Sequence, residues 1–177
     1  MKGDEASMRT FYERYYGFAL SVCLAYTNNQ EDARELLNDG FLKIFKHLKT
    51  LQDAKTIMPW IRRIMVNTGI DYYRKNKQKV PEISLDEVAY SLAENNMSDT
   101  QILAKISAEE IIKVLQTIPL TYRIVFSLYV LEGYSHAEIA EKLGIVESTS
   151  RAHLTEANKR LRKALNIQNE HGERTKQ

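Results

Sequence analysis

The sequence has few of the residues that break regular structure or cross-link a chain. Among 177 residues there are seven glycines, three prolines and one cysteine. Scarce glycine and proline argue against a β-sandwich with many tight turns and favour an all-helical protein. A single cysteine excludes an internal disulfide and a zinc site built on cysteines, and it fits a reducing compartment. We therefore expect an all-α, cytoplasmic protein.

The sequence also has no long apolar run. The longest charge-free apolar stretch near the N-terminus, residues 17–26, is far shorter than the ~20 residues that span a bilayer. Residues 1–10 mix both charge signs and have no apolar signal-peptide core. We expect no direct membrane insertion. Hydrophobic residues make up 44% of the chain, enough to bury the core of one ordinary domain or two small ones.

The net charge of +2 conceals an uneven distribution. Residues 59–79 hold six basic side chains and one acidic, and residues 147–165 hold five basic and two acidic. Between them, residues 80–104 hold five acidic side chains and no basic one. Two basic blocks indicate contact with a polyanion, although a solvated helix face also explains either block by itself.

The hydrophobic pattern predicts two small helical domains joined by a flexible linker. The first covers residues 1–78. Residues 79–98 have no sustained period and form an acidic linker, with at most a short helix over 86–93. The second domain covers residues 99–166 and is followed by a polar tail over 167–177.

Three amphipathic helices are expected in the first domain. One covers about residues 7–26, Asn29 suits the N-cap of the second, and the third runs from Pro59 to about residue 77. In the second helix, apolar residues recur every 3.6 positions and define a buried stripe. Five residues fall outside that stripe and should be exposed: Asn38, Asp39, Leu42, Lys43 and Lys46.

The second domain is predicted to contain a helix-turn-helix. Ser98 and Gln101 have capping-box spacing and begin a helix that ends before Pro119, and the next helix covers about residues 120–131. Ser135 and Glu138 form a second capping box, and Gly144 suits a left-handed helix end.

The last helix, over about residues 147–165, would then insert its N-terminal half into a DNA major groove. Its inner face is formed by Ser150, Leu154, Ala157, Leu161, Ala164 and Leu165. Seven residues lie off that face: Ser148, Thr149, Arg151, Ala152, His153, Thr155 and Glu156. A helical hairpin with a solvated basic face remains the alternative.

Residues 59–75 contain basic side chains interspersed with aromatic ones and an amide, a combination that suits single-stranded nucleic acid. Tyr72 and Tyr73 are adjacent, so at least one of them should face away from the core. A purely structural role is equally open for this segment, because Trp60 also suits a core position and Asp71 can pair with Arg74 or a neighbouring lysine.

An ordered set of motifs resembles the extracytoplasmic-function (ECF) sigma factors, the minimal two-domain branch of the bacterial sigma-70 family. The set covers about residues 8–165. Its members are residues 11–16 (FYERYY), 31–45 (EDARELLNDGFLKIF), 59–64 (PWIRRI), 67–75 (NTGIDYYRK), 118–123 (IPLTYR), 125–126 (VF), 132–140 (EGYSHAEIA), 143–145 (LGI), 148–151 (STSR) and 159–161 (KRL).

The resemblance implies a role for each segment. The core-polymerase-binding segment matches Asp32, Asn38, Asp39, Phe41, Leu42, Ile44 and Phe45, of which Phe41 and Phe45 are also expected in the core. The segment that recognises and opens the −10 promoter element matches Arg62, Arg63, Asn67, Tyr73, Arg74 and Lys75, preceded by a specificity loop over about residues 51–58. The −35-binding helix matches Ser148, Thr149, Arg151, Ala152, His153, Thr155, Lys159 and Arg160.

The resemblance implies three partners: bacterial core RNA polymerase, promoter DNA and an anti-sigma factor, which is often membrane-tethered. It implies no catalysis, no small-molecule substrate, no cofactor and no metal. Three positions depart from the family pattern: Val146 cannot cap the last helix, and Glu156 and Asn158 stand where many members are basic.

Two other classes of protein remain as alternatives. A stand-alone helix-turn-helix regulator would bind duplex DNA directly and would need no polymerase-binding helix. An enzyme is not supported, because the four histidines are scattered and the chain has no glycine-rich phosphate loop.

Overall fold

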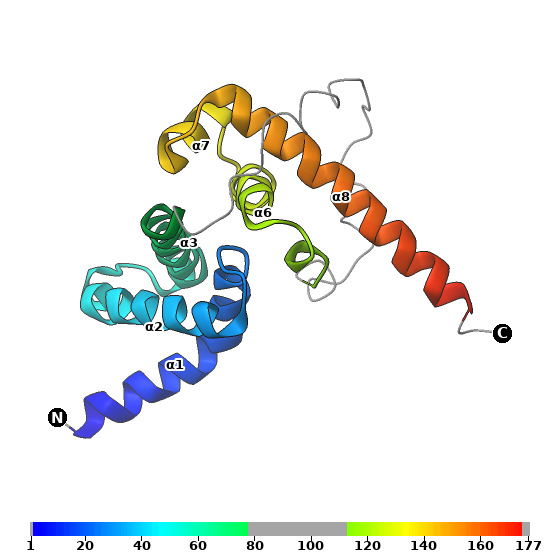
Figure 1. Ribbon diagram of the computed structural model, residues 1–177. Helices are drawn as coiled ribbons and strands as arrows, with labels where there is room; N and C mark the ends of the chain where they lie inside the picture. The colour runs from blue at the N-terminus through cyan, green and yellow to red at the C-terminus, as the bar shows by residue number, and fades with distance from the viewer. Residues whose placement is uncertain (1, 78–112, 175–177) are drawn as a thin grey trace. The chain divides into compact units, whose positions relative to one another are not determined.

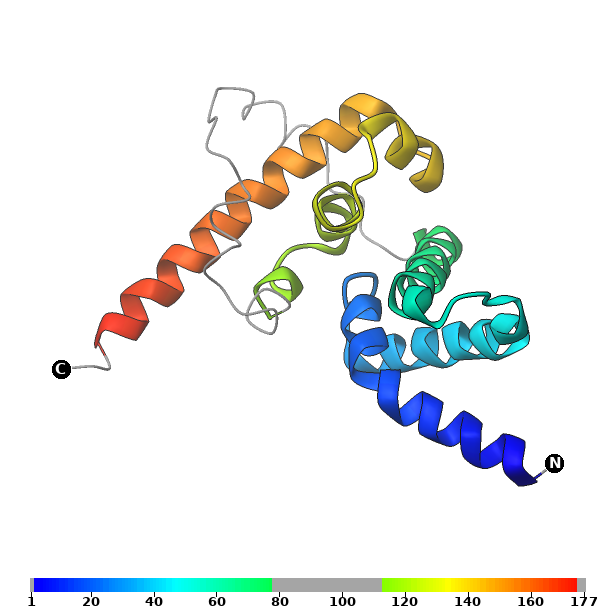
Figure 2. The same ribbon diagram turned by 180° about the vertical axis from the view of Figure 1, so that it is seen from behind.

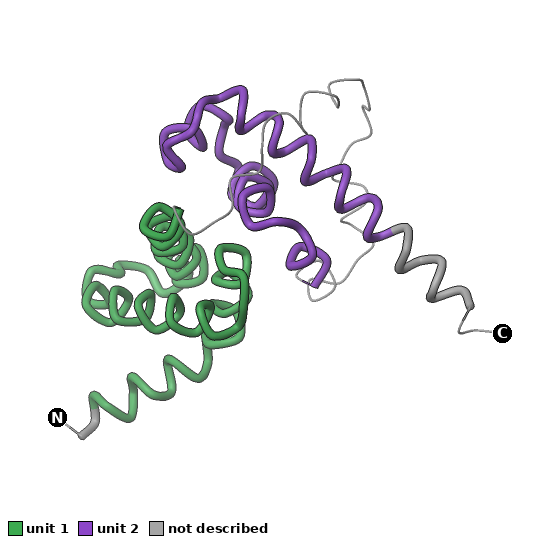
Figure 3. The backbone as a smooth tube through the Cα atoms, in the orientation of Figure 1, with its two compact units in different colours: residues 1–77 green, residues 78–177 purple. Residues whose placement is uncertain are grey.

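The computed structural model describes residues 2–77 and 113–174, with side chains over 4–77 and 113–165. The chain divides into two compact units, Met1–Lys77 and Gln78–Gln177, coloured green and purple in Figure 3. Every regular element within the described ranges is helical, as the low glycine and proline content predicted. The predicted linker over 79–98, with its short helix, and the capping box at Ser98 and Gln101 lie outside the described residues.

Unit 1 packs three helices against one another: α1 (Lys2–Cys23), α2 (Gln30–His47) and α3 (Ile57–Asn76) (Figure 1). Two short 3-10 turns, η1 (Leu48–Thr50) and η2 (Ala54–Thr56), connect α2 to α3. The predicted start of α2 is confirmed.

The core of unit 1 forms where the apolar stripes of the three helices meet. Two glycines allow close approach there: Gly40 on α2 faces Met65, and Gly69 on α3 faces the ring of Tyr26. The buried apolar side chains are Ala19, Val22, Cys23, Tyr26, Ala33, Leu36, Leu37, Phe41, Ile44, Ile61, Met65, Val66, Ile70 and Tyr73.

Unit 2 is described from a helical turn over residues 113–116 onward. Its elements are α6 (Leu120–Phe126), the π-helical turn η5 (Ser127–Leu131), α7 (His136–Leu143) and α8 (Glu147–Arg174). Both α6 and α7 pack against α8 (Figure 2).

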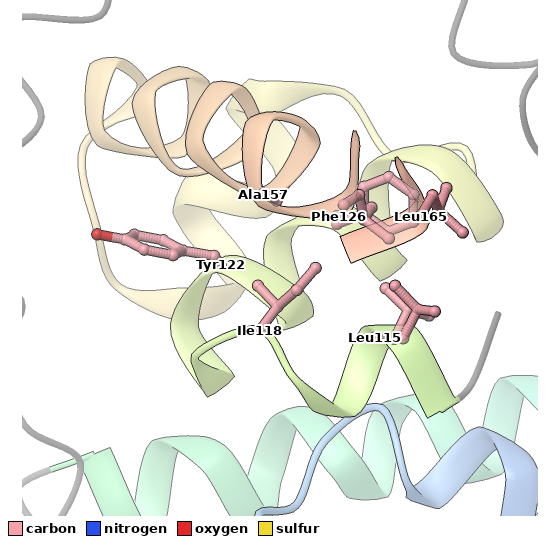
Figure 4. Close-up of a cluster of buried hydrophobic side chains, with 8 residues drawn as sticks. Leu115, Ile118, Tyr122, Phe126, Ala157 and Leu165 are labelled. Atoms are coloured by element: carbon pink, nitrogen blue, oxygen red, sulfur yellow. The ribbon is translucent and has the colours of Figure 1, made fainter. Parts of the chain in front are cut away.

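The core of unit 2 joins residues from the start of the unit to α8. In Figure 4, side chains from the segment before α6 and from α6 itself point toward α8. The cluster consists of Val114, Leu115, Ile118, Tyr122, Phe126, Ala157, Leu161 and Leu165.

The predicted capping signals of the helix-turn-helix are confirmed. The N–H of Glu138 donates to Ser135 Oγ at 3.3 Å, and the N–H of Ser135 donates to Glu138 Oε2 at 2.8 Å. Gly144 ends α7 in the left-handed region with φ 63°, which glycine adopts without steric cost. These local signals fix where α7 begins and ends.

Three predicted helix boundaries or types are wrong. α1 covers Lys2–Cys23 instead of residues 7–26, and its end tightens into an i→i+3 bond from the N–H of Tyr26 to the carbonyl of Cys23. The helix predicted over 120–131 changes to π geometry, with the N–H of Glu132 donating to the carbonyl of Ser127. α8 continues to Arg174, because no proline follows the last position of the apolar stripe.

Candidate polymerase and nucleic-acid interfaces

An exposed stripe runs along α2. Asn38, Asp39 and Leu42 lie on it, as the periodicity predicted, and Leu42 is 69% exposed. Glu35 and Lys46 extend the stripe by one turn in either direction and are exposed too. The exposed apolar side chain of Leu42 thus lies among polar ones on the helix that the resemblance assigns to polymerase binding. We call these five residues the α2 stripe.

The other predicted polymerase-binding residues of α2 face inward. Phe41 and Ile44 are buried, and Asp32 and Phe45 are half-buried. The expectation that Phe41 belongs to the core is confirmed. The set that the resemblance supplied therefore divides into exposed residues and residues that hold α2 against its neighbours, and contact of the second group with polymerase stays a prediction.

Asp32 is engaged within unit 1. Its backbone N–H donates to Asn29 Oδ1 at 2.7 Å, and its Oδ2 accepts from Asn29 Nδ2 at 3.0 Å. Its carboxylate also accepts a hydrogen bond from Tyr72 of α3. Burial, and then this hydrogen bond, raise the pKa of Tyr72 to about 12. Asn29 thus caps α2, and the Asp32 side chain ties the first turn of α2 to α3.

Aromatic rings of α1 pack against aromatic rings of α2 next to the α2 stripe. The rings of Tyr12 and Phe41 lie 4.5 Å apart, and those of Phe11 and Phe45 lie 5.9 Å apart. The Tyr12 hydroxyl donates to Asn38 Oδ1 at 3.3 Å. Tyr12 was not among the predicted site residues, although the motif over residues 11–16 contains it.

The exposed face of α3 holds most of the residues predicted to contact the −10 element. Arg63, Asn67, Arg74 and Lys75 are exposed and fall within one face at helical spacing. Arg62 is half-buried on the opposite side. The face therefore combines cationic side chains with one amide that is able to hydrogen-bond a base.

Tyr73 lies in the core of unit 1, where it is 2% exposed. Tyr72, its neighbour, is half-buried against α2. A contact between Tyr73 and DNA stays a prediction, and this position does not favour it, because the ring packs where α3 meets the rest of unit 1.

Lys43 links α2 to the exposed face of α3. Its Nζ donates to Thr68 Oγ1 at 3.1 Å and to Asp71 Oδ2 at 3.3 Å. Asp71 therefore pairs with a lysine on another helix, whereas the sequence suggested Arg74 or Lys75. The ion pair keeps the acidic group of this face close to α2.

The loop predicted to determine −10 specificity, residues 51–58, is short and ordered by its own hydrogen bonds. Asp53 Oδ1 accepts from the N–H of Lys55 at 2.9 Å, and Thr56 Oγ1 donates to the carbonyl of Asp53 at 2.8 Å. Met58, the last residue of this segment, lies in the first turn of α3 and is 39% exposed. The segment presents exposed polar side chains together with the exposed apolar side chain of Met58.

The outer face of α8 carries most of the residues predicted to contact the −35 element. Ser148, Arg151, Thr155 and Lys159 are exposed at one-turn intervals. Thr149 and Ala152 are half-buried beside them, and Arg160 is exposed. The predicted inner face of α8 is confirmed, with Ser150, Ala157, Leu161 and Leu165 buried and Leu154 and Ala164 packed against the core.

His153 differs from its predicted outward placement, because it is only 8% exposed. Its imidazole meets the ring of Tyr122 edge-on at 5.1 Å between centroids. Burial lowers the pKa of His153 below its ordinary value, so the neutral form is favoured. A contact between His153 and DNA stays a prediction that this buried position does not favour.

Two arginines of α8 are paired with glutamates one turn earlier. Arg151 Nη2 binds Glu147 Oε1, and both side chains are well exposed. Arg160 Nε donates to Glu156 Oε1 at 2.6 Å, and its guanidinium lies over the Tyr122 ring at 5.3 Å. The Glu156 side chain is only 13% exposed. Arg160 is thus part of the packing between α8 and α6.

His136, at the start of α7, meets the same end of α8. It stacks on Tyr129 with centroids 4.5 Å apart, and its Nδ1 lies 3.0 Å from Ser150 Oγ. Desolvation lowers the pKa of His136, and the charge of Arg151 lowers it further, while Glu147 opposes the shift. His136 was not predicted as a site residue, and only its place in the motif over residues 132–140 marks it.

The described ranges contain no candidate for two other kinds of site. Among residues 4–77 and 113–165, no group of three or more histidine, cysteine or acidic side chains is placed to hold a metal ion. None of the helices in the part of the chain that the structure describes is long and apolar enough to cross a membrane.

Two family models match the chain, one for each unit. The model of sigma-70 region 2 matches residues 11–79, and the model of sigma-70 region 4 matches residues 108–161. The chain is 32% identical over 138 residues to the RNA polymerase sigma factor SigZ of Bacillus subtilis, covering 78% of this chain and 75% of that one. It is 27% identical over 155 residues to the ECF RNA polymerase sigma factor SigM of the same species, covering 88% and 93%.

The chain also matches the solved structure of the sigma factor RpoE of Bartonella quintana in complex with the anti-sigma factor NepR. The TM-score is 0.48 with 15% sequence identity, covering 91% of this chain and 98% of that one.

With an exposed basic face in each unit and both regions in family order, the chain belongs to the ECF group of the sigma-70 family. Its relatives are named RNA polymerase sigma factors, and its two matched regions are the promoter-binding regions 2 and 4. The resemblance stated from the motifs is therefore confirmed.

Proposed function

We propose that this sigma factor docks on core RNA polymerase through the α2 stripe and presents α3 and α8 to the two halves of a promoter. The observation that carries the proposal is Leu42, an apolar side chain that is 69% exposed one turn after Asn38 and Asp39. Burying such a side chain against a partner contributes about 1.5–3 kcal/mol. A stand-alone DNA-binding regulator needs no surface for polymerase.

For the −10 element, we propose that Arg63, Arg74 and Lys75 bind phosphates while Asn67 hydrogen-bonds a base. All four side chains are exposed on one face of α3. Cationic side chains beside base-contacting groups suit a strand that has left the duplex. The segment over residues 51–58 leads into this helix and would accept a base flipped out of the stack.

For the −35 element, we propose that the N-terminal half of α8 enters the major groove. Arg151 would bind a guanine edge, and Ser148 and Thr149 would bind phosphates near the helix N-terminus. Lys159 would bind the backbone further along. In this arrangement His153 and Arg160 position α8 through Tyr122.

The proposal includes no chemical step carried out by this chain. As the family resemblance implies, the sigma factor acts by binding and the polymerase supplies the catalysis. We further propose that it works in the cytoplasm together with RNA polymerase. An anti-sigma factor, the partner class that the resemblance also implies, would hold it inactive.

The test of the α2 stripe is a charge reversal at its centre. Asp39→Lys is expected to weaken binding to core polymerase by at least about tenfold, because it reverses the charge that the centre of the stripe presents to its partner. The unfolding midpoint should stay unchanged, since Asp39 is exposed. Binding is measured by competition between labelled wild type and variant for core polymerase.

Glu13→Lys on α1, also exposed, is the matched control for the change in net charge. Unchanged affinity of Asp39→Lys would reject the polymerase-binding role of the stripe. Tight binding of the chain to duplex DNA without polymerase would favour the stand-alone regulator.

A further inference from the structure

The first turn of α8 places an acid and a base together at the tip of the proposed −35 surface. Glu147 is the first residue of the helix, and Arg151 lies one turn later on the same side. The guanidinium Nη2 binds the glutamate Oε1. Glutamate four residues before a basic partner is the favourable orientation on a helix.

This ion pair differs from the second pair on the same helix. Glu156 and Arg160 are held by burial and by the Tyr122 ring, with the Glu156 side chain only 13% exposed. The side chains of Arg151 and Glu147 are 63% and 46% exposed. An exposed pair contributes little to folding. Because both side chains are exposed, the Glu147–Arg151 pair is accessible to DNA while α8 stays folded.

We propose that Glu147 is a specificity-determining residue of the −35 surface and that it acts by positioning Arg151. The inference rests on the proposed contact between Arg151 and the −35 duplex. Arginine has five N–H donors in a planar fork, so one edge can stay on the carboxylate while another binds a base. Glu147 thereby fixes the direction in which the free edge points.

The negative charge of Glu147 has a second effect in the same direction. It offsets the charge of Arg151 and repels phosphate, which lowers the sequence-independent part of the affinity. A guanine edge offers Arg151 two acceptors in a plane, whereas a phosphate constrains the orientation of the guanidinium less. Sites with the correct base are therefore favoured over random DNA.

The groups nearest to the Glu147–Arg151 pair are consistent with a preorganised first turn of α8. His136 of α7 interacts electrostatically with both Glu147 and Arg151, and its Nδ1 lies 3.0 Å from Ser150 Oγ. The backbone of Arg151 also accepts a hydrogen bond from Thr155 Oγ1 at 3.1 Å. The acid, the base and the imidazole thus converge where α7 meets α8.

The test is a double-mutant cycle in the complete holoenzyme. Core polymerase with wild type, Glu147→Gln, Arg151→Ala or the double variant selects from promoter duplexes randomised across the −35 element, and sequencing gives the preference at each position. Glu147→Gln is expected to reduce the base preference due to Arg151 by about threefold or more and to tighten binding to scrambled duplexes. In the Arg151→Ala background it should leave the base preference unchanged.

Two further variants separate positioning from general charge. Glu147→Asp keeps the charge at the helix N-terminus but shortens the side chain, so it should behave like Glu147→Gln in base preference. Glu13→Gln removes one exposed negative charge in unit 1 and should leave the −35 preference unchanged.

Three results would overturn the inference. The first is an unchanged base preference in Glu147→Gln. The second is an equal change of base preference when Glu147→Gln is made in the Arg151→Ala background, which would make Glu147 itself a DNA contact. The third is a Glu147→Asp variant with the base preference of wild type. If Arg151→Ala itself leaves the −35 preference intact, the proposed base contact of Arg151 fails as well. If Arg151→Ala abolishes the preference and Glu147→Gln does not alter it, only the inference fails.

Discussion

At the scale of single residues, His153 shows how a side chain near a DNA-binding surface can serve the core. Its ring is buried against Tyr122, and burial lowers its pKa. The unfolded chain then binds a proton more readily than the folded chain does. The free energy of unfolding therefore falls as the pH drops below the ordinary histidine value of about 6.5.

We expect the unfolding midpoint of unit 2 to decrease between about pH 7.5 and pH 5, and His153→Phe to reduce that decrease. Phenylalanine preserves the aromatic packing and cannot be protonated. His47→Gln, an exposed position in unit 1, is the control. The measurement is chemical unfolding followed by far-UV circular dichroism. An identical pH dependence in wild type and His153→Phe would contradict this account.

The orientation of site residues could be predicted in part from the sequence. The outward placement of Asn38, Asp39 and Leu42 followed from helical periodicity alone, because α2 is covered on one side. His153 lies at the edge of the inner face of α8, and only the ring of Tyr122, more than twenty residues away in the chain, decides that it is buried. Long-range packing of this kind leaves no local signal.

At the scale of elements, the close approach of helices in unit 1 depends on two glycines with different neighbours. A Cβ at Gly69 would overlap the ring of Tyr26, whereas one at Gly40 would overlap the end of the Met65 side chain. Tyr26 is 1% exposed and its ring is rigid, while a methionine side chain can change rotamer.

Gly69→Ala is therefore expected to destabilise unit 1 by about 2 kcal/mol through overpacking. Gly40→Ala should change the free energy of unfolding by less than about 1 kcal/mol, because the helix propensity gained by alanine offsets the shift of Met65. Urea unfolding of both variants gives the comparison. Equal destabilisation by the two substitutions would show that rigidity of the facing side chain is not the cause.

The start of α8 offers a second prediction at this scale. The carbonyl of Val146 accepts the first helical bond from Ser150, yet its side chain has no oxygen to cap the helix and is 64% exposed. Val146→Ser should therefore raise the stability of unit 2 by about 1 kcal/mol. Val146→Ala removes the exposed apolar group without adding an acceptor and should give no such gain. The midpoint of thermal unfolding distinguishes them, and a loss of stability in Val146→Ser would contradict the capping argument.

Helix boundaries were predictable where capping residues mark them. Asn29 and Ser135 supply side chains that cap the start of a helix, and Gly144 supplies the left-handed backbone conformation that terminates one. The structure has a helix boundary at each of the three. The π-helical turn after Phe126 has no such marker in the sequence, and no side chain caps it. The continuation of α8 to Arg174 was missed because the apolar stripe ends earlier than the helix.

At the scale of the whole molecule, the order of the motifs predicted the family, and the family models match the same two regions. Each unit has its own buried core and its own exposed basic face. The small net charge of +2 is thus a sum over segments with opposite charge. A modest total charge gives weak sequence-independent attraction to DNA, which suits a protein that depends on a large partner for promoter binding.

The most direct test of this account is promoter-specific transcription by core RNA polymerase with and without the chain. Duplexes are first selected by the assembled holoenzyme from a pool randomised across both promoter elements and are then used as templates. The account predicts that transcripts start only when the chain is present, and that scrambling either the −10 or the −35 element reduces them strongly. Two results would contradict the account. One is transcription from these templates at the same level without the chain. The other is selection of a single duplex element that the chain binds equally well without polymerase.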